Sequence, residues 1–445
     1  MTARIGDAVA VLGAGMGGLA AAAALAPFFE RVVLIERDSL PDGAAHRDGT
    51  PQARHLHALL AGGERALNEL LPGFTEHLRA AGAVPYRVGF DVRIERPGFD
   101  PFPRRDLGWL AHGMSRPLVE SVLRQLVQVL PNVEMRFQCR ATELLADAGR
   151  VRGVAFDTAA GPRQTMDAAL VVDATGRGVP TLDLLAAQGE PLPADTAIEV
   201  NLRYATAVFT IPEACSADWL GVMHLPRTPQ ETHGAILLPI ERQRWIISLG
   251  TRFEDPPTER EGFMAFIRGL RTPTLHDALC DAEMLGGVRQ FAFPASVWRH
   301  FERLDRFPGG LIPLGDAVCR FNPIYGQGMS VAAQEARLLS RLLALVDEAD
   351  VASGALAQRF FAEAQALIET PWAMAAVPDL AYPDTRGERP PDLAATLQFS
   401  QALTRLAAKD PDVHKLTIEV QHLLRPNTAY REPALAQRVM QEMTS

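Results

Sequence analysis

A glycine-rich turn near the amino terminus has the residue types and spacing that bind a pyrophosphate. It reads Gly13-Ala14-Gly15-Met16-Gly17-Gly18. In such a turn the first glycine permits the tight bend, the next lets the backbone approach the phosphates, and the last lets helix and strand pack closely. Amide N–H groups at the start of the following helix point at the anion, so no lysine is needed. The predicted cofactor contacts in this turn are Gly13, Ala14, Gly15, Met16 and Gly18.

The residues around this turn predict a βαβ unit. Residues 8–12 are apolar, residues 16–25 are rich in helix formers, and residues 31–36 are β-branched and apolar. Glu36 ends the second strand-like run, about 20 residues after the turn, where a carboxylate accepts hydrogen bonds from a ribose hydroxyl. The sequence therefore predicts a dinucleotide site that includes Glu36 and Arg37. This motif alone does not distinguish FAD from NAD.

Three later segments bear on which dinucleotide is bound. They are Val171-Val172-Asp173-Ala174-Thr175-Gly176-Arg177-Gly178, Gly315-Asp316-Ala317, and the run from Phe321 to Ser330, FNPIYGQGMS. The first two resemble the second and third fingerprints of the para-hydroxybenzoate hydroxylase-like flavoprotein monooxygenase superfamily. The third resembles its flavin loop. The resemblance implies bound FAD, with Asp316 contacting the ribityl chain and amides at a helix start facing the isoalloxazine edge, where a helix N-terminus stabilises the reduced flavin.

The resemblance extends to segments on either side of these fingerprints. Arg116, which follows Ser115 at the start of an amphipathic run, is similar to a flavin-contacting arginine of the family. Residues 52–57 resemble the segment that covers the flavin in bacterial polyketide epoxidases and hydroxylases, and residues 369–390 resemble their C-terminal region. The further cofactor contacts that the resemblance implies are Arg54, His55, Leu56, Arg116, Arg140, Ala141, Ala174, Thr175, Gly176, Gly315, Asp316, Pro323, Gly326, Gly328 and Met329.

Composition excludes several classes of function. A net charge of -9 argues against nucleic acid as a partner, because neutralising its backbone needs clustered cations. The four cysteines lie far apart with no Cys/His cluster, which predicts neither a metal site nor a disulfide framework and favours a reducing cytoplasm. The uncharged stretch over residues 8–29 is mostly Ala and Gly, so we expect the βαβ unit there and no stable membrane insertion.

The order of the segments predicts an α/β protein with several units. At 445 residues the chain exceeds the roughly 250–300 residues at which single cores stop growing. Residues 52–71 have leucines at helical spacing and predict one helix, while residues 198–210, 235–240 and 245–249 are strand-like. We expect a glutathione reductase-type, Rossmann-like FAD domain, an inserted and mostly antiparallel substrate sheet, and a helical C-terminal region. The expected bounds are 1–82 with 105–185 and 300–350, then 83–104 with 186–299, then 351–445.

The resemblance implies a monooxygenase that inserts one atom of O2 into an apolar organic substrate through a flavin C4a-hydroperoxide. Epoxidation and hydroxylation both stay open, and the resemblance implies a role in secondary metabolism. The cofactor performs the difficult step while the protein positions and shields, so Pro323, Tyr325, Gly326 and Gln327 are expected to shape the reaction site. Many single-component members have Asp-Gly in the middle motif where this chain has Thr175-Gly176. NAD(P)H is therefore expected to act either directly or through a separate flavin reductase.

Other activities remain as alternatives. A flavin-dependent reductase of isoprenoid double bonds uses the same cofactor domain, and a non-redox cyclase would keep FAD only as structure. Halogenases of this scaffold rely on an active-site lysine and a Trp-x-Trp-x-Ile-Pro segment. This chain has lysine only at Lys409 and Lys415, and its tryptophans are isolated, which argues against halogenation.

Overall fold

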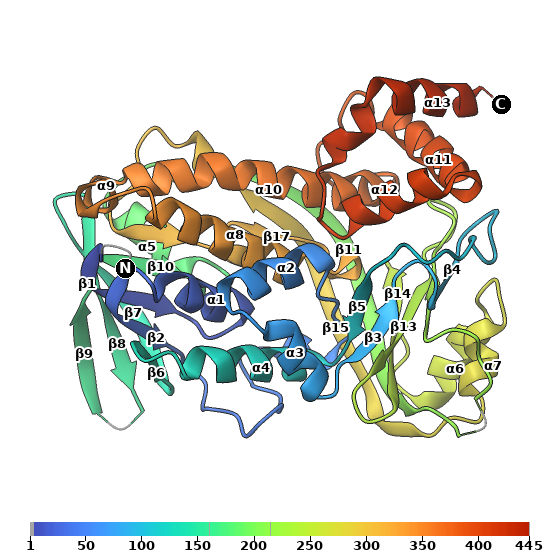
Figure 1. Ribbon diagram of the computed structural model, residues 1–445, viewed down its shortest axis with the longest axis horizontal. Helices are drawn as coiled ribbons and strands as arrows, with labels where there is room; N and C mark the ends of the chain where they lie inside the picture. Colours follow the sequence, from blue (N-terminus) through green and yellow to red (C-terminus); the bar gives the residue numbers. More distant parts are fainter. Residues whose placement is uncertain (1–3, 160, 214, 445) are drawn as a thin grey trace.

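Two large β-sheets organise the protein (Figure 1). The computed structural model describes residues 4–159, 161–213 and 215–444. The first sheet has five parallel strands in the order β16-β10-β1-β2-β6. Its strands are β1 (Gly6–Leu12), β2 (Phe29–Ile35), β6 (Val133–Arg136), β10 (Leu170–Asp173) and β16 (Leu311–Pro313).

Helices cover the parallel sheet, which explains why its strands are apolar without alternation. Val9 to Leu12 are fully buried, and so are Val171 and Val172 on the neighbouring strand. Helix α1 (Met16–Leu25) consists mainly of alanine and glycine, so it packs closely against α4 (Arg116–Gln128) and α8 (Gly328–Leu343). An antiparallel meander, β7 (Cys139–Asp147), β8 (Arg150–Thr158) and β9 (Gly161–Asp167), lies at one end of the sheet (Figure 1).

The second sheet has seven strands in the order β17-β15-β11-β14-β13-β12-β4 and is antiparallel except at the β12–β4 pair. One face packs against α6 (Arg260–Arg268) and α7 (Thr274–Leu279) around Phe209, Trp245 and Phe263. The other face turns toward the loop before α2 (Ala61–Leu70). The strands are β4 (Val92–Glu95), β11 (Asp195–Thr210), β12 (Gly221–His224), β13 (Gly234–Ile240), β14 (Arg244–Arg252), β15 (Met284–Arg299) and β17 (Cys319–Arg320).

Smaller elements join the two sheets. Helix α3 (Phe74–Ala80) leads into the ribbon of β3 (Val84–Arg87) and β5 (Leu110–Gly113), and α5 (Val179–Ala187) follows β10. The C-terminal helices are α9 (Glu348–Ser353), α10 (Ala355–Leu380), α11 (Leu393–Lys409), α12 (Pro411–Gln421) and α13 (Pro433–Met443). The last three pack around a separate buried cluster that also contains Phe102, whereas the first half of α10 packs into the main core (Figure 1). No helix in the described ranges is long and apolar enough to cross a bilayer.

The structure confirms the α/β class, the Rossmann-like domain, the antiparallel sheet and the C-terminal helices. The single helix expected over residues 52–71 is wrong in its first half. A short 3-10 turn covers Pro51–Arg54, residues 55–60 are not helical, and α2 begins at Ala61. Tertiary contacts override the leucine spacing here, because His55 and Leu56 bond to hydroxyls of the second sheet. The domain bounds expected above stay a prediction.

Replacing Phe301 tests the packing of α10 on the main core. Phe301 is 2% exposed and stacks on Phe361 of α10 with ring centroids 5.2 Å apart. We expect Phe301→Ala to lower the free energy of unfolding in urea by about 3–5 kcal/mol, because a large buried aromatic ring leaves a cavity. Leu345→Ala, at a 66% exposed position, is the control and is expected to change it by less than about 0.5 kcal/mol. Equal effects of the two variants would contradict this packing.

Candidate active site

Four loops meet at the carboxyl edge of the parallel sheet. Gly13 follows β1, Glu36 follows β2, Ala174 follows β10 and Gly315 follows β16. The backbone joins them directly: Gly13 N donates to Ile35 O at 2.8 Å, Ala174 N to Leu12 O at 3.0 Å, and Leu314 N to Asp173 O at 3.0 Å. The glycine turn and the Gly315-Asp316 pair, about 300 residues apart in sequence, therefore lie at one edge.

Two glycines of the turn are required by the fold itself, and a third has open space beside it. Gly13 has φ +95°, and a Cβ on Gly18 would lie 1.8 Å from the carbonyl oxygen of Gly13. Both positions exclude a side chain for reasons within the protein. Gly15 has an ordinary φ of -76°, and a Cβ there would meet no described atom within 4 Å. The open space beside Gly15 is where a pyrophosphate would approach the backbone.

A buried chain of charges extends from the end of β2. Glu36 Oε2 accepts from Ala14 N at 2.7 Å and lies 3.1 Å from Arg47 Nη1. Arg47 Nε donates to Glu120 Oε1 at 2.7 Å, and Glu120 Oε2 lies 2.7 Å from Arg116 Nη1. Burial raises the pKa of Glu120, but Arg116 and Arg47 outweigh it and hold the pKa below its usual range. The predicted contacts Glu36 and Arg116 are thus joined through two residues, Arg47 and Glu120, that sequence reasoning missed.

Asp316 and Arg116 lie near enough at this edge for their charges to interact. Ser115 caps α4 by accepting from Leu118 N at 3.3 Å, which places Arg116 at the first turn. The Asp316 carboxyl is reached by solvent yet is surrounded by protein on most sides. Desolvation raises its pKa to about 6 against the opposing charges of Arg320, Arg116 and Arg299. This exposed carboxyl, close to the charges of three arginines, is suited to hydrogen-bond a polyhydroxyl chain.

The flavin loop, residues 321–330, ends in a helix start. Asn322 caps the 3-10 turn Pro323–Tyr325, Gly326 has φ +68°, and α8 begins at Gly328. The Gln327 side chain is 1% exposed, and neither its amide oxygen nor its nitrogen has a partner in the described part of the chain. A buried amide without partners is costly. A ligand edge that carries both a donor and an acceptor, as the flavin pyrimidine ring does, would satisfy it.

We call residues 55–60 the cover loop, because it lies between the flavin loop and the second sheet. A Cβ on Gly326 would lie 3.1 Å from Ala58 Cβ. On the other side His55 Nδ1 lies 2.9 Å from Thr206 Oγ1, which lies 2.6 Å from Ser248 Oγ. His55 is 2% exposed, and burial together with the charge of Arg54 lowers its pKa to about 4. The imidazole is therefore neutral at pH 7.

The remaining predicted contacts differ in how firmly they are held. Thr175 donates from N and Oγ1 to Asp173 Oδ1 at 3.1 and 2.7 Å, and the other carboxylate oxygen accepts from Thr181. Cys139 N bonds to Glu36 O at 2.9 Å, so Arg140 and Ala141 start β7 beside the end of β2. Three side chains are exposed and have no hydrogen bond or ion pair in the described ranges: Arg37, Arg54 and Arg140.

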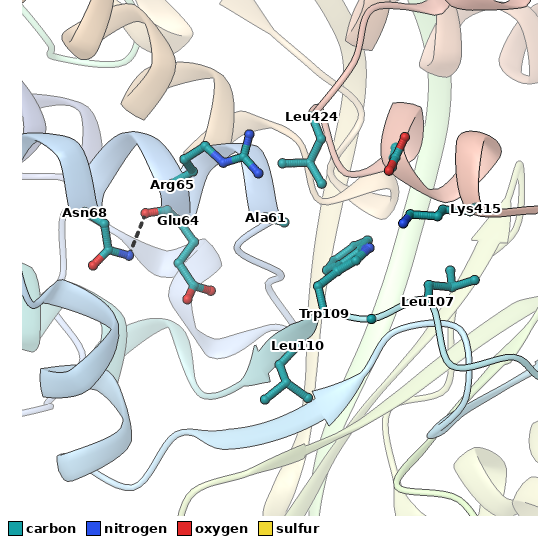
Figure 2. A pocket seen from close by; sticks show the side chains of 11 residues that line it. Ala61, Glu64, Arg65, Asn68, Leu107, Trp109, Leu110, Lys415 and Leu424 are labelled. Atoms are coloured by element: carbon teal, nitrogen blue, oxygen red, sulfur yellow. Dashed lines mark hydrogen bonds between the residues drawn. The ribbon is translucent and has the colours of Figure 1, made fainter. Parts of the chain in front are cut away.

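Two cavities lie near this region. The larger, about 460 Å³, opens between α2 and α12 and is lined by none of the predicted site residues. Figure 2 shows Trp109 and Lys415 on one side of it and the side chains of α2 on the other. The second, about 400 Å³, is lined by two predicted contacts together with three arginines and three apolar residues: Gly176, Asp316, Arg177, Arg299, Arg320, Val179, Leu182 and Val297. Asp316 thus lines a cavity in which the other charged side chains are arginines.

Comparison with known proteins decides the family. The model of the FAD dependent oxidoreductase family matches residues 8–235. Protein Rv3254 of Mycobacterium tuberculosis (strain ATCC 25618 / H37Rv) is 32% identical over 397 residues, which cover 86% of this chain and 82% of that protein. This chain belongs to the FAD-dependent oxidoreductase family.

Two other similarities bear on the fold and on part of the chain. Squalene monooxygenase 1,1 of Brassica napus is 31% identical over 175 residues, covering 39% of this chain and 33% of that protein. The solved structure of the flavin-dependent brominase Bmp2 superposes with a TM-score of 0.69 at 15% identity and covers 99% of both chains. At that identity it shows the fold alone. These findings confirm an FAD-dependent oxidoreductase and the flavoprotein fold that the resemblance implied.

The residues present fit FAD. The space beside Gly15 accepts a pyrophosphate, Glu36 after β2 and Asp316 after β16 lie three strands apart along the sheet edge, and the Gln327 amide lacks a partner in the described part of the chain. Arg116 Nη1 is likewise buried without a well-directed hydrogen bond. We infer that an FAD-dependent oxidoreductase of this geometry holds the adenosine near Glu36, the ribityl chain near Asp316 and the flavin near residues 322–329. The individual contacts stay predictions.

Alanine at Gly15 and at Gly18 separates cofactor binding from folding. We expect Gly15→Ala to keep the thermal stability of the FAD-free protein, because its Cβ meets no described atom, yet to weaken FAD binding by more than about tenfold. Gly18→Ala is expected to destabilise the FAD-free protein, because a Cβ 1.8 Å from a backbone oxygen outweighs the gain in helix propensity of about 1 kcal/mol. Melting curves and retained flavin absorbance measure both. Undiminished FAD binding by Gly15→Ala would count against the pyrophosphate site.

Glu335 predicts a pH dependence of stability. It is fully buried and accepts from Gly315 N at 2.6 Å, and burial raises its pKa from 4.5 to about 8 despite that bond. The folded state therefore binds more protons than the unfolded state between about pH 4.5 and pH 8, so this group lowers stability as the pH rises through that window. Glu335→Gln keeps the hydrogen-bond acceptor. Between pH 5 and pH 8, its free energy of unfolding in urea is expected to fall by less than that of the wild-type protein. The exposed Glu388→Gln is the control, and a Glu335→Gln profile that matches it would contradict the assignment.

Proposed function

We propose that this FAD-dependent oxidoreductase is a monooxygenase that inserts one atom of O2 into an apolar organic substrate by epoxidation or hydroxylation. The observation that carries the proposal is the apolar, aromatic face that the second sheet presents to the flavin loop. Tyr204 and Phe293 belong to one buried cluster, and the partly buried Ile324 of the flavin loop packs against it. Similarity to a squalene monooxygenase over 175 residues supports an apolar substrate.

Bound reduced flavin supplies the activation of O2, and the protein supplies a dry and shaped site. The His55 ring lies edge-on to Tyr204 and Phe291, with ring centroids 4.7 and 5.5 Å away. These rings exclude water from the space next to the flavin loop. The imidazole is uncharged at pH 7, so it contributes a polar contact in this space without the desolvation cost of a cation.

Halogenation is disfavoured by where the two lysines lie. Lys409 Nζ bonds to both carboxylate oxygens of Glu442 at 2.8 Å, and Lys415 lines the cavity of Figure 2. In the described residues neither lysine has a hydrogen bond or ion pair with a predicted flavin contact. The positions of these two lysines support oxygenation over halogenation.

The source of electrons is proposed to be NAD(P)H, either directly or through a separate flavin reductase. The Asp173 carboxylate is fully buried and is used by Thr175 and Thr181 within the loop after β10. It is therefore not free to bind a second dinucleotide. The arginines beside Asp316 leave direct binding of a phosphate-bearing donor open.

Oxygen uptake by the purified FAD-loaded protein tests the proposal. We expect uptake with NADPH, or with NADPH and a separate flavin reductase, to be coupled to formation of an oxygenated product from an apolar alkene or arene. Labelled O2 should place one atom of label in that product. Reduction of an isoprenoid double bond without uptake would identify a reductase, and turnover with oxidised FAD and no reductant would identify a cyclase; either result overturns the proposal.

A further inference from the structure

Asp379, in the last turn of α10, is the centre of a buried polar cluster next to the flavin loop. The side chain is 1% exposed. Asn322 Nδ2 donates to its two oxygens at 3.1 and 2.9 Å, and Tyr325 Oη donates to Oδ1 at 3.0 Å. Arg252, at the end of β14, pairs with the same oxygen through Nη2. One carboxylate of the C-terminal helices thus joins two residues of the flavin loop to the second sheet.

The charges in this cluster compensate one another. A lone buried carboxylate is strongly disfavoured, whereas an ion pair with several hydrogen bonds is tolerated. The Arg252 side chain is 5% exposed, and its guanidinium stacks over Tyr382 at 4.6 Å from the ring centroid. Burial and the neighbouring Asp379 raise the pKa of Tyr325 well above its usual range. Tyr325 therefore stays a neutral donor to the carboxylate.

The hydrogen bonds of Asp379 fix the conformation of the flavin loop at two points. Asn322 is fully buried, and its Oδ1 accepts from Ile324 N at 3.2 Å, which caps the turn Pro323–Tyr325. Because its Nδ2 is held by Asp379, the cap cannot rotate away. Tyr325 fixes the end of the turn, directly before Gly326 in its left-handed conformation. The next residue is Gln327, whose side-chain amide has no hydrogen-bond partner in the described part of the chain.

We propose that Asp379 is a positioning residue that sets the conformation of Asn322–Gly326 from the C-terminal helix and thereby the environment of the bound flavin. It contacts no reacting atom itself. The inference rests on the FAD site of the proposed function, but not on the choice of oxygenation over other flavin chemistry. Through Asp379, the C-terminal region would help to fix the conformation of the flavin site.

The experiment measures the flavin itself in the FAD-loaded full chain. Asp379→Asn keeps the size of the side chain and removes its charge, and Tyr325→Phe removes one donor without changing any charge. We expect each variant to shift the visible spectrum and the reduction potential of the flavin, and Asp379→Asn to weaken FAD binding by about tenfold. The double variant is expected to shift them by less than the sum of the single changes, because both act through one contact.

Asp384→Asn is the matched control, since Asp384 is exposed four residues after the end of α10 and has no hydrogen bond or ion pair in the described ranges. It is expected to leave the flavin unchanged. If Asp379→Asn lowers only the melting temperature and keeps the wild-type spectrum and potential, the positioning role is overturned. If Asp379→Asn does not fold, Tyr325→Phe decides in the same way. A wild-type protein that binds no FAD would instead overturn the proposed function.

Discussion

The carboxyl ends of four parallel strands, held in register, are the constraint on which the rest of the structure depends. Each strand delivers one loop to the same edge, and the backbone bonds between neighbouring loops leave little freedom in how they approach. The contact between Gly18 and the carbonyl of Gly13 sets how close α1 comes to β1. The direction of the α1 N-terminus, and with it the position of a bound anion, follows from that contact.

A second set of interactions relates the parallel sheet to the antiparallel sheet. The cover loop contacts the flavin loop through Ala58 and the sheet through His55. The contacts at this junction are neutral or charge-balanced: the Thr206 hydroxyl bonds to His55, and Arg252 pairs with Asp379. Polar groups are kept in an otherwise apolar space only where partners satisfy them. The site therefore combines fixed orientation with a largely apolar environment, which the proposed oxygen chemistry of the flavin would need.

The sequence predicts what is local and misses what depends on contacts between distant segments. The glycine turn, the strand ending at Glu36 and the capped helix at Arg116 are local patterns and are found where expected. Arg47 lies in a stretch with no such pattern, and Asp379 lies in the segment 369–390, whose resemblance to epoxidase-like enzymes gives the residue no role. Only the folded chain shows that both are buried ion-pair partners. Glu120 could have been found, because it lies four residues after Arg116 on a predicted helix. Leucine spacing predicts a helix over the cover loop because it carries no information about the two hydroxyls that bond to this loop from 151 and 192 residues further along the chain.

The position of β16 at the edge of the parallel sheet has a consequence for the order in which the protein can mature. β16 is the last strand added to this sheet along the chain, and α8, which braces Gly315 through Glu335, is synthesised after it. On the ribosome, the glycine turn is therefore synthesised long before the Gly315-Asp316 pair that lies at the same sheet edge. Topologies that depend on such distant pairings fold slowly. FAD is thus expected to be captured after translation, by an almost complete polypeptide, and not by its emerging N-terminal third.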